Sequence, residues 1–596
     1  MSLSVTKKRS LAALAAACLA SVALPATPAL AQKVKNKTPA AEASASSVDY
    51  VVTIPSVEAV QSSMDEATIT DILSGNLAGN AAALAELDAT SITIPEITVT
   101  LDVEVDGETE RGTLTLSNLV LEDVSDGVAT SMRLNGSSFA TPEGNADMGT
   151  ISAENVNLAA ILGIYGLVDA GASREMQTLY TDFLVGGGSF SSDEFSCDIG
   201  AISGGEVRGR PFETSFVEII SIAQSMEDNP EDISPELLGK FVRMYADLLT
   251  AFESSEFTFD GLDCAGTTDE GEALAISVAG ITMAGMSPGI YPQLSFDGLS
   301  IVADDGTMAL ENFTLKQFDL SSVIATLEAA PELVEESWFE ANGRGLIPAF
   351  EGFSFSGLSM DIEDQDNEGE RIIADVAEFD LSLGQYLNGI PSALDTWARG
   401  LRVDLPEDSE DEQVQQLLAL GITTIDAGFR IAAAWNADTN TIDVEEVSMS
   451  GVDLASVALK GTIANATEAL FSLDMDEAMT AGMGMAVKAL SVDVVDSGLS
   501  DIVLAVVSAE QKVDPKTLRP VFAGLAEGTV VGMMAGVADA AKLGSALSSF
   551  IAGKAKSLNI SVEAKDDPGL SLEDFMMAED DPTTLLGKVN IDASAK

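Results

Sequence analysis

The chain of 596 residues contains no histidine. Without imidazole there can be no Ser-His-Asp or Cys-His nucleophile system, and no zinc, iron or copper site built on histidine ligands. The sequence also lacks a phosphate loop that ends in Gly-Lys-Ser/Thr, because Gly186-Gly187-Gly188 is not followed by that pattern. These absences exclude the commonest forms of hydrolysis and phosphoryl transfer.

Basic residues are scarce: 30 Lys and Arg stand against 95 Asp and Glu, a formal net charge of −65. Such a chain repels phosphate backbones and anionic lipid head groups, so we expect no nucleic-acid partner. Because 46% of the residues are hydrophobic and the mean hydropathy is positive, we expect a folded protein and not an acidic disordered tail.

Aromatic residues are also few, with three Trp and six Tyr. Two carboxylates suffice for glycoside hydrolysis, but with so many acids any pair can be chosen, and glycan sites usually offer aromatic platforms. We therefore expect a protein that is not an enzyme, and keep a carboxylate-only hydrolase of envelope glycans as an alternative.

The N-terminus has the features of a secretory signal. Residues 7–9 are basic, residues 11–24 form an apolar run too short to span a bilayer, and Ala29-Leu30-Ala31 fits signal peptidase. We predict a signal peptide at residues 1–31, cleaved near Ala31, followed by a flexible leader at residues 32–47. The expected location is the periplasm or the extracellular space, with no transmembrane helix after cleavage.

Cysteine usage agrees with export. Cys18 would leave with the signal, and Cys197 and Cys264 remain as an even pair in an oxidising compartment. We predict a disulfide between them; the alternative is two buried free thiols.

Strand-like alternation and helical spacing of apolar residues follow each other along the chain. The phrase Phe-x-Gly-Leu begins at Phe259, Phe296 and Phe355, and the second and third copies lead to Phe-Asp-Leu-Ser at Phe318 and Phe379. We interpret each unit as a hairpin, an aspartate N-cap and a helix, with helices expected at residues 323–336 and 383–400. The alternative is that such short phrases recur by chance in a strand-rich protein.

We therefore predict an α+β fold: an extended, curved antiparallel β-sheet of loosely repeated hairpin-helix units, with amphipathic helices on its apolar face. The predicted regions are an N-terminal α+β region at 48–255, a repeat region at 256–460 and a helix-rich region at 461–596. In the last, small residues recur every fourth position from Gly524 to Ser548, on one or two helices between residues 516 and 550. This ridge favours close packing within the protein over membrane insertion.

The best candidate for a metal site is an acidic loop that follows part of a calcium-loop pattern. Asp364, Asp366 and Glu368 alternate before Gly369, and Asp375 stands at the twelfth position. Three departures from this pattern favour an ordinary hairpin loop. The third ligand is a glutamate, the twelfth residue is an aspartate where calcium loops have a bidentate glutamate, and the flanking segments look like strands. We expect no other cofactor and no catalytic residues.

These observations lead to three hypotheses for function. The first is an exported, non-enzymatic binding or scaffold protein of the cell envelope that holds a lipid-like ligand between sheet and helices, where Met-rich surfaces adapt well. The second is a structural or adhesive envelope protein with calcium-stiffened acidic loops, and the third is the glycan hydrolase. The expected partners are a lipid or another envelope component.

Overall fold

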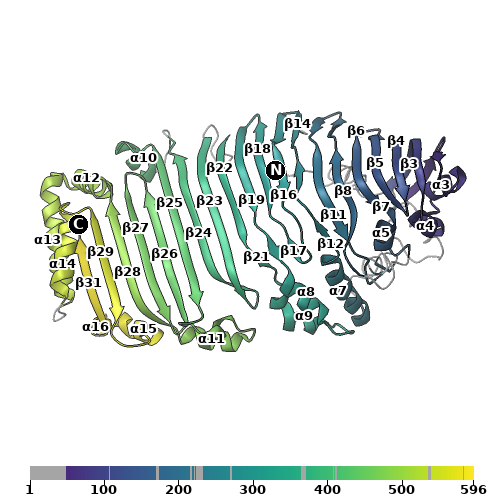
Figure 1. Ribbon diagram of the computed structural model, residues 1–596. Helices are drawn as coiled ribbons and strands as arrows, with labels where there is room; N and C mark the ends of the chain where they lie inside the picture. Colours follow the sequence, from purple (N-terminus) through teal and green to yellow (C-terminus); the bar gives the residue numbers. More distant parts are fainter. Residues whose placement is uncertain are drawn as a thin grey trace. The chain divides into compact units, whose positions relative to one another are not determined.

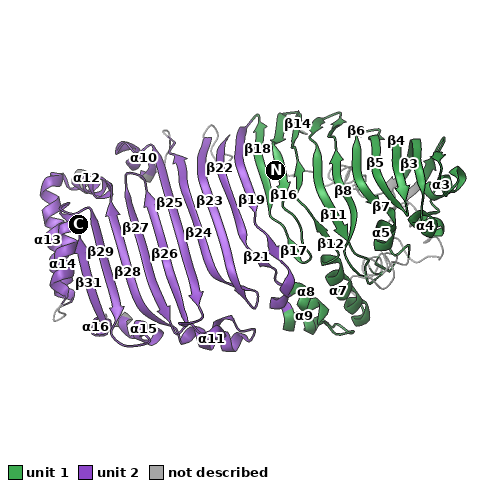
Figure 2. Cartoon of the chain, viewed as in Figure 1, with its two compact units in different colours: residues 1–304, 323–342 green, residues 305–322, 343–596 purple. Residues whose placement is uncertain are grey.

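The computed structural model describes residues 48–105, 108–168, 174–214, 218–219, 222, 233–268, 271–363, 371–406, 409, 412–534, 539–580 and 583–596. The predicted signal peptide and leader lie outside these residues. The chain divides into two compact units, which are residues 1–304 with 323–342, and residues 305–322 with 343–596 (Figure 2).

Strands make up 50% of the chain and helices 27%, and the strands form a large antiparallel β-sheet (Figure 1). The predicted α+β class with an antiparallel sheet is therefore confirmed. In the described part of the chain, no helix is both long enough and apolar enough to cross a bilayer.

Unit 1 is built on strands that pair antiparallel throughout. They are β1 (Val48–Thr53), β2 (Glu58–Val60), β3 (Ala89–Val105), β4 (Glu108–Ser125), β5 (Val128–Thr141), β6 (Gly144–Met148), β7 (Ile151–Asn157), β8 (Gln177–Val185), β9 (Gly188–Ser192), β10 (Phe195–Ile199), β11 (Ile202–Gly209), β12 (Phe252–Ser254), β13 (Phe257–Phe259), β14 (Leu262–Thr267), β15 (Ala273–Val278), β16 (Gly280–Met283), β17 (Ile290–Tyr291) and β18 (Leu294–Ala303). Its helices are α3 (Glu66–Leu73), α4 (Leu77–Ala85), α5 (Leu158–Ile164), α7 (Pro235–Leu249), α8 (Ser321–Glu328) and α9 (Glu336–Asn342).

The N-terminal part of unit 1 has a conventional buried core. Helices α3 and α5 pack with one face of β3, β4, β5 and β7, where Ile92, Ala153 and Ile161 are among the buried side chains. Both helices begin at polar caps: Asp65 accepts the amide of Thr68, and Asn157 accepts that of Ala160. This sheet face is covered by the protein's own helices.

Unit 2 contains longer strands in a simple order. They are β19 (Gly306–Leu315), β20 (Phe318–Asp319), β21 (Ala349–Phe350), β22 (Gly352–Glu363), β23 (Arg371–Leu387), β24 (Ile390–Asp404), β25 (Thr424–Asn436), β26 (Thr441–Gly451), β27 (Ala455–Ala464), β28 (Ala486–Asp496), β29 (Ser557–Ala564), β30 (Leu570–Ser571) and β31 (Val589–Ala595). From β22 to β29 each strand pairs with the next one along the chain.

The helices of unit 2 follow its strands. They are the short 3₁₀ turns η2 (Gly343–Leu346) and η3 (Glu468–Phe471), and the helices α10 (Glu412–Ala419), α11 (Met475–Met483), α12 (Leu499–Gln511), α13 (Pro515–Met533), α14 (Ala540–Ile551), α15 (Leu572–Asp580) and α16 (Thr583–Leu586). The segment from residue 516 to 550 thus forms two helices. Of the small-residue ridge, a Cβ added at Gly544 would come within 3.2 Å of Val531 Cγ2, whereas one added at Gly524, Gly528 or Gly532 would meet nothing within 4 Å.

One predicted helix is wrong. Residues 383–400 lie in β23 and β24, which turn at Asn388-Gly389 with φ of 49° and 75°. Two positive φ values are those of the hairpin turn that Asn-Gly favours, so the turn reverses the chain and pairs Leu387 with Ile390. Asp380, expected to cap that helix, lies within β23.

Candidate functional site

Unit 2 presents a sheet face that is apolar from strand to strand. Residues opposite each other in an antiparallel pair share a face, so the strand register identifies rows of neighbouring side chains. Two adjacent rows cross β22–β28, and they define what we call the apolar face. The rows are Phe355, Phe379, Ala398, Phe429, Met449, Val457 and Val494, and Phe353, Leu381, Thr396, Ile431, Val447, Leu459 and Val492.

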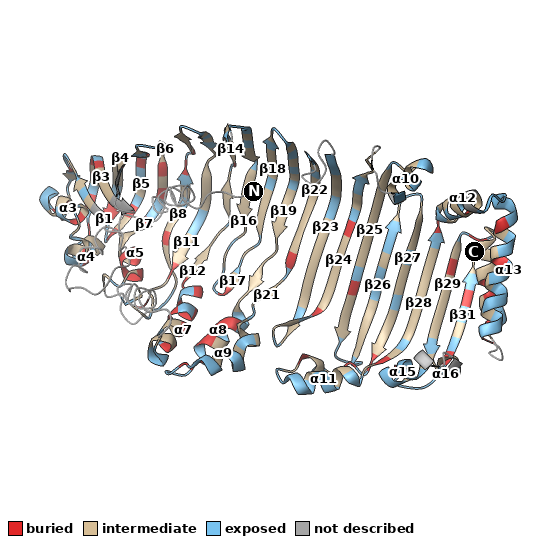
Figure 3. Cartoon of the chain, turned by 180° about the vertical axis from the view of Figure 1, so that it is seen from behind, coloured by how far each residue is buried: buried red, intermediate tan, exposed pale blue. Residues whose placement is uncertain are grey.

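Part of this face is open to water: Ile431, Val447, Met449 and Val457 are exposed. Within β22–β28, the hydrophobic residues that are buried are all alanines: Ala398, Ala432, Ala464 and Ala486. The large side chains are half-buried or exposed, up to 69% for Met449 (Figure 3). Apolar patches of this extent are uncommon on soluble proteins and usually mark a binding surface.

Aromatic rings gather at one end of the apolar face. The ring of Phe379 stacks against Phe353 and Phe355, with centroids 5.3 and 5.1 Å apart, and Phe313 of β19 lies 6.1 Å from Phe353. Next to them, buried Ala398 stands between Phe379 and Phe429 in the same row.

The opposite face of the same strands is polar. The Lys316 ammonium group lies 2.7 Å from Asp380, and the Arg430 guanidinium lies 2.9 Å from Asp395 and 3.3 Å from Glu446. The hydrogen bond to Asp395, followed by the charges of Asp395 and Glu446, raises the pKa of Arg430 above its ordinary value. Charged groups are thus confined to one face, as in a sheet with one solvated side.

In the described part of unit 2, the last strands have helical cover on the apolar face. Ala546 of α14 packs with Leu558 of β29 and Ala593 of β31, in a small core that also includes Phe550 and Val494. Val494, Leu558 and Ala595 continue the first row of the apolar face. The chain therefore uses this same face for its own hydrophobic packing where a helix is available.

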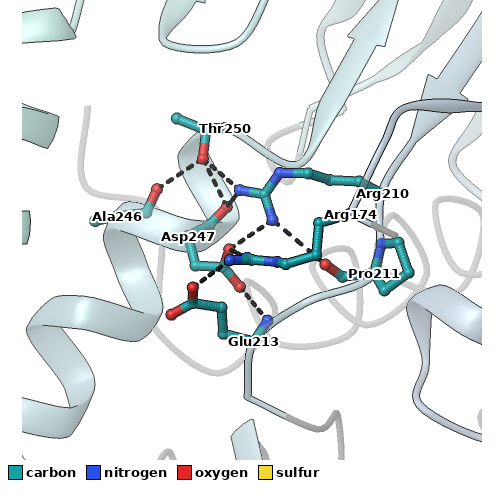
Figure 4. Close-up of polar contacts among 7 residues, drawn as sticks. All are labelled: Arg174, Arg210, Pro211, Glu213, Ala246, Asp247 and Thr250. Atoms are coloured by element: carbon teal, nitrogen blue, oxygen red, sulfur yellow. Dashed lines mark hydrogen bonds and ion pairs between the residues drawn. The ribbon is translucent and has the colours of Figure 1, made fainter. Parts of the chain in front are cut away.

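Unit 1 contains a buried carboxylate cluster around Asp247 (Figure 4). The side chain of Asp247 on α7 is 7% exposed, and its Oδ1 accepts hydrogen bonds from Arg174 and Arg210, both at 2.7 Å. Its Oδ2 accepts the backbone N–H of Glu213 at 2.7 Å, and the Glu213 carboxylate pairs with Arg174. These contacts join α7 to the segment after β11. Because two acids balance two arginines, the cluster leaves no unpaired charge that could act on a substrate.

The predicted disulfide is present. Cys197 of β10 and Cys264 of β14 are bonded and stand directly opposite each other in the register. They form part of the lining of a hollow of about 470 Å³, which also includes five serines, Asp198, Asp263 and apolar residues such as Phe190, Ile276 and Val302.

The acidic-loop candidates cannot be assembled into a site. Asp364, Asp366 and Glu368 lie outside the described residues, and Asp375 lies in β23 opposite Ser359 and Arg402. Among the residues that are described, no three Asp, Glu or Cys side chains are placed to hold a metal ion. The calcium loop stays a prediction.

Sequence reasoning missed both the open state of the apolar face and the Asp247 cluster. The alternation in β25 and β26 gives a signal for the first, because Phe429 and Ile431, or Val447 and Met449, alternate with polar residues. No comparable signal exists for the cluster, because Arg174 and Asp247 are 73 residues apart.

Residues 448–596 match the model of a protein family described only as "Uncharacterized protein". This segment runs from within β26 to the end of the chain and is less than half of its length. No curated protein and no solved structure matches the chain.

Proposed function

We propose that this chain is an exported, non-enzymatic binding protein of the cell envelope that holds a lipid-like ligand on the apolar face of unit 2. The observation that carries the proposal is the pair of rows across β22–β28, which contain no ionisable side chain and are partly exposed. Burial of an acyl chain there would contribute up to about 0.8 kcal/mol per CH₂ group.

The size of the face suits an acyl chain. Strands in a sheet lie about 4.8 Å apart, so β22–β28 extend for about 29 Å. The hydrocarbon core of a bilayer, which two opposed chains fill, is about 30 Å thick. One extended acyl chain therefore fits across the rows, beginning at the phenylalanine cluster or beside α14.

Export is part of the proposal. The predicted signal peptide motivates it, and a disulfide such as Cys197–Cys264 persists in oxidising compartments. A carrier that crosses an aqueous compartment must shield an apolar ligand and remain soluble, and the ion pairs of the polar face support solubility.

We also propose that the Phe-x-Gly-Leu phrases mark a repeated strand geometry, without the helix that was predicted after the third copy. Gly298 in β18 and Gly357 in β22, the glycines of two Phe-x-Gly-Leu phrases, both have a φ of 63° within a strand. A left-handed residue bends a strand locally and increases its twist. The same local geometry at two copies of the phrase supports a repeated unit.

The test places one charge on each face. Met449 and Ser450 are consecutive, exposed residues of β26, so Met449→Glu and Ser450→Glu add the same charge to opposite faces. Binding of a fluorescent monoacylglycerol, a neutral probe, is measured by titration. We expect Met449→Glu to weaken binding at least about tenfold, or about 1.4 kcal/mol, and Ser450→Glu to leave it unchanged.

Equal binding by both variants would exclude the apolar face as the ligand site. Native mass spectrometry of the protein from its own envelope fraction gives an independent check. A stoichiometric bound lipid supports the proposal, and a lipid-free mass in repeated detergent-free preparations would refute it.

A further inference from the structure

Helix α11 carries a stripe of exposed methionines. Met475, Met479 and Met483 follow at intervals of four residues, which places them on one side of the helix. Each is more than half exposed, and no residue of α11 is buried. The sulfur of Met475 lies 3.8 Å from the Arg344 guanidinium. The protein does not use this helix face for its own core.

Helix α15 exposes a second apolar stripe. Leu572, Phe575 and Met576 have the i, i+3, i+4 spacing of one helix side, and all three are exposed. Met576 is 65% exposed, a high value for so large an apolar side chain. Two helices of unit 2 thus have unpartnered apolar sides.

The two stripes belong to the same edge of the sheet. Ala486 at the start of β28 pairs with Ser571 of β30. Met483 lies just before Ala486 in the sequence, and Leu572 directly follows Ser571, so the end of α11 is close to the start of α15. Figures 1 and 3 both place α11 and α15 along this edge. We call Met475, Met479, Met483, Leu572, Phe575 and Met576 the methionine edge.

The methionine edge has acidic neighbours. Asp476, Glu477 and Glu573 are exposed residues of the same two helices. They stand on a chain whose formal net charge is −65. A surface of flexible, polarisable methionines adapts to differently shaped apolar partners, and flanking carboxylates select for basic ones.

We infer that the methionine edge is a docking surface for a basic amphipathic helix of a partner protein. The apolar side of such a helix would lie on the methionines, and its Lys or Arg residues would face Asp476 and Glu573. A membrane surface fits less well, because interfacial helices are rich in Lys and Arg, whereas these helices carry acids and anionic lipids would repel them.

The test uses a synthetic peptide as the partner. A labelled Leu/Lys peptide of about 18 residues, or five helical turns, carries leucine at helical spacing, and a scrambled peptide of the same composition has no apolar side. Fluorescence anisotropy measures the binding of each to the full chain. The variant Met475→Gln/Met479→Gln/Met483→Gln removes the stripe, and the control variant Leu525→Gln/Met533→Gln changes exposed apolar residues of α13. Circular dichroism verifies that both variants fold.

We expect the amphipathic peptide to bind more tightly than the scrambled one and to weaken with added salt. The α11 variant should lose at least about tenfold in affinity, and the control variant should bind like the wild type. Equal affinity for the two peptides, or no effect of the α11 variant, would overturn the inference. Failure of the peptide to bind while phosphatidylcholine vesicles bind through α11 would also overturn it and make the edge a lipid contact.

Discussion

The Asp247 cluster allows a sharp test of how unit 1 is held together. Asp247→Asn removes the negative charge while keeping the shape of the side chain. In the native protein the carboxylate accepts hydrogen bonds from Arg174, Arg210 and the Glu213 amide, each at 2.7 Å. Asparagine offers one acceptor oxygen and turns an NH₂ group toward one of these donors.

The cost can be estimated from the geometry. Loss of the Glu213 hydrogen bond to a charged acceptor costs about 1.5–3 kcal/mol, and breaking a buried ion pair costs about 3–5 kcal/mol in all. Because Arg174 is 44% exposed and water can solvate it, the lower end applies, so we expect a loss of about 3 kcal/mol. This is less than the total stability of a typical domain, so the variant should still fold.

Urea unfolding followed by circular dichroism measures the loss, and hydrogen exchange of the α7 amides locates it. Glu213→Gln is the matched control, because the Glu213 side chain is 61% exposed and its ion pair with Arg174 should contribute at most about 1 kcal/mol. If the two variants were equally stable, the carboxylate of Asp247 would not be the centre of the cluster.

Two further predictions concern unit 2. Gly389→Ala should lower the free energy of unfolding by about 2–3 kcal/mol, because φ is 75° and an added Cβ would overlap the Arg344 carbonyl oxygen. Gly421→Ala should lower it by only about 1 kcal/mol, because φ is 82° but an added Cβ would meet open space. Equal urea midpoints for the two variants would contradict this. Burial opposes the ionisation of Asp496, but hydrogen bonds from Ser500 and Gly498 and the charge of Lys556 outweigh it, so its pKa lies below the ordinary 3.8. The stability that it adds is therefore complete above about pH 5 and is lost as pH falls below the ordinary pKa and through the lowered one, so wild type should progressively lose its advantage over Asp496→Asn as the pH is lowered from about 5. A constant difference in urea midpoints would refute the assignment.

The antiparallel sheet and the disulfide could be predicted because each leaves a local signal. Alternation of apolar and polar residues identifies strands such as Ile97–Val103, which lies within β3. An even pair of cysteines in a chain with a predicted export signal indicates a disulfide, and Cys197 is bonded to Cys264.

The helix predicted at residues 383–400 failed because two periodicities coincide there. Leu383, Leu387, Ile390 and Leu394 have helical spacing, yet Leu394, Thr396 and Ala398 also alternate as a strand. The Asn388-Gly389 dipeptide is a strong hairpin signal, and it decides between the helical and the strand periodicity in favour of two strands.

The rest depends on contacts between distant residues. Local alternation shows which face of β26 is apolar, but not whether a helix covers it: α14 covers Leu558 of β29 and leaves Met449 of β26 in water. Likewise, the pairing of Arg174 and Arg210 with Asp247 depends on where the chain places α7 against β11. Neither arrangement follows from spacing within one segment.

The sequential pairing of β22–β29 has an evolutionary consequence. Because each strand contacts its predecessor and successor in the chain, inserting or deleting a hairpin would lengthen or shorten the face by about 10 Å without breaking other pairings. Insertion or deletion within the gene can therefore change the length of the apolar face in steps of two strands. Homologues with different numbers of hairpins would then present apolar faces of different lengths while keeping the same helical end.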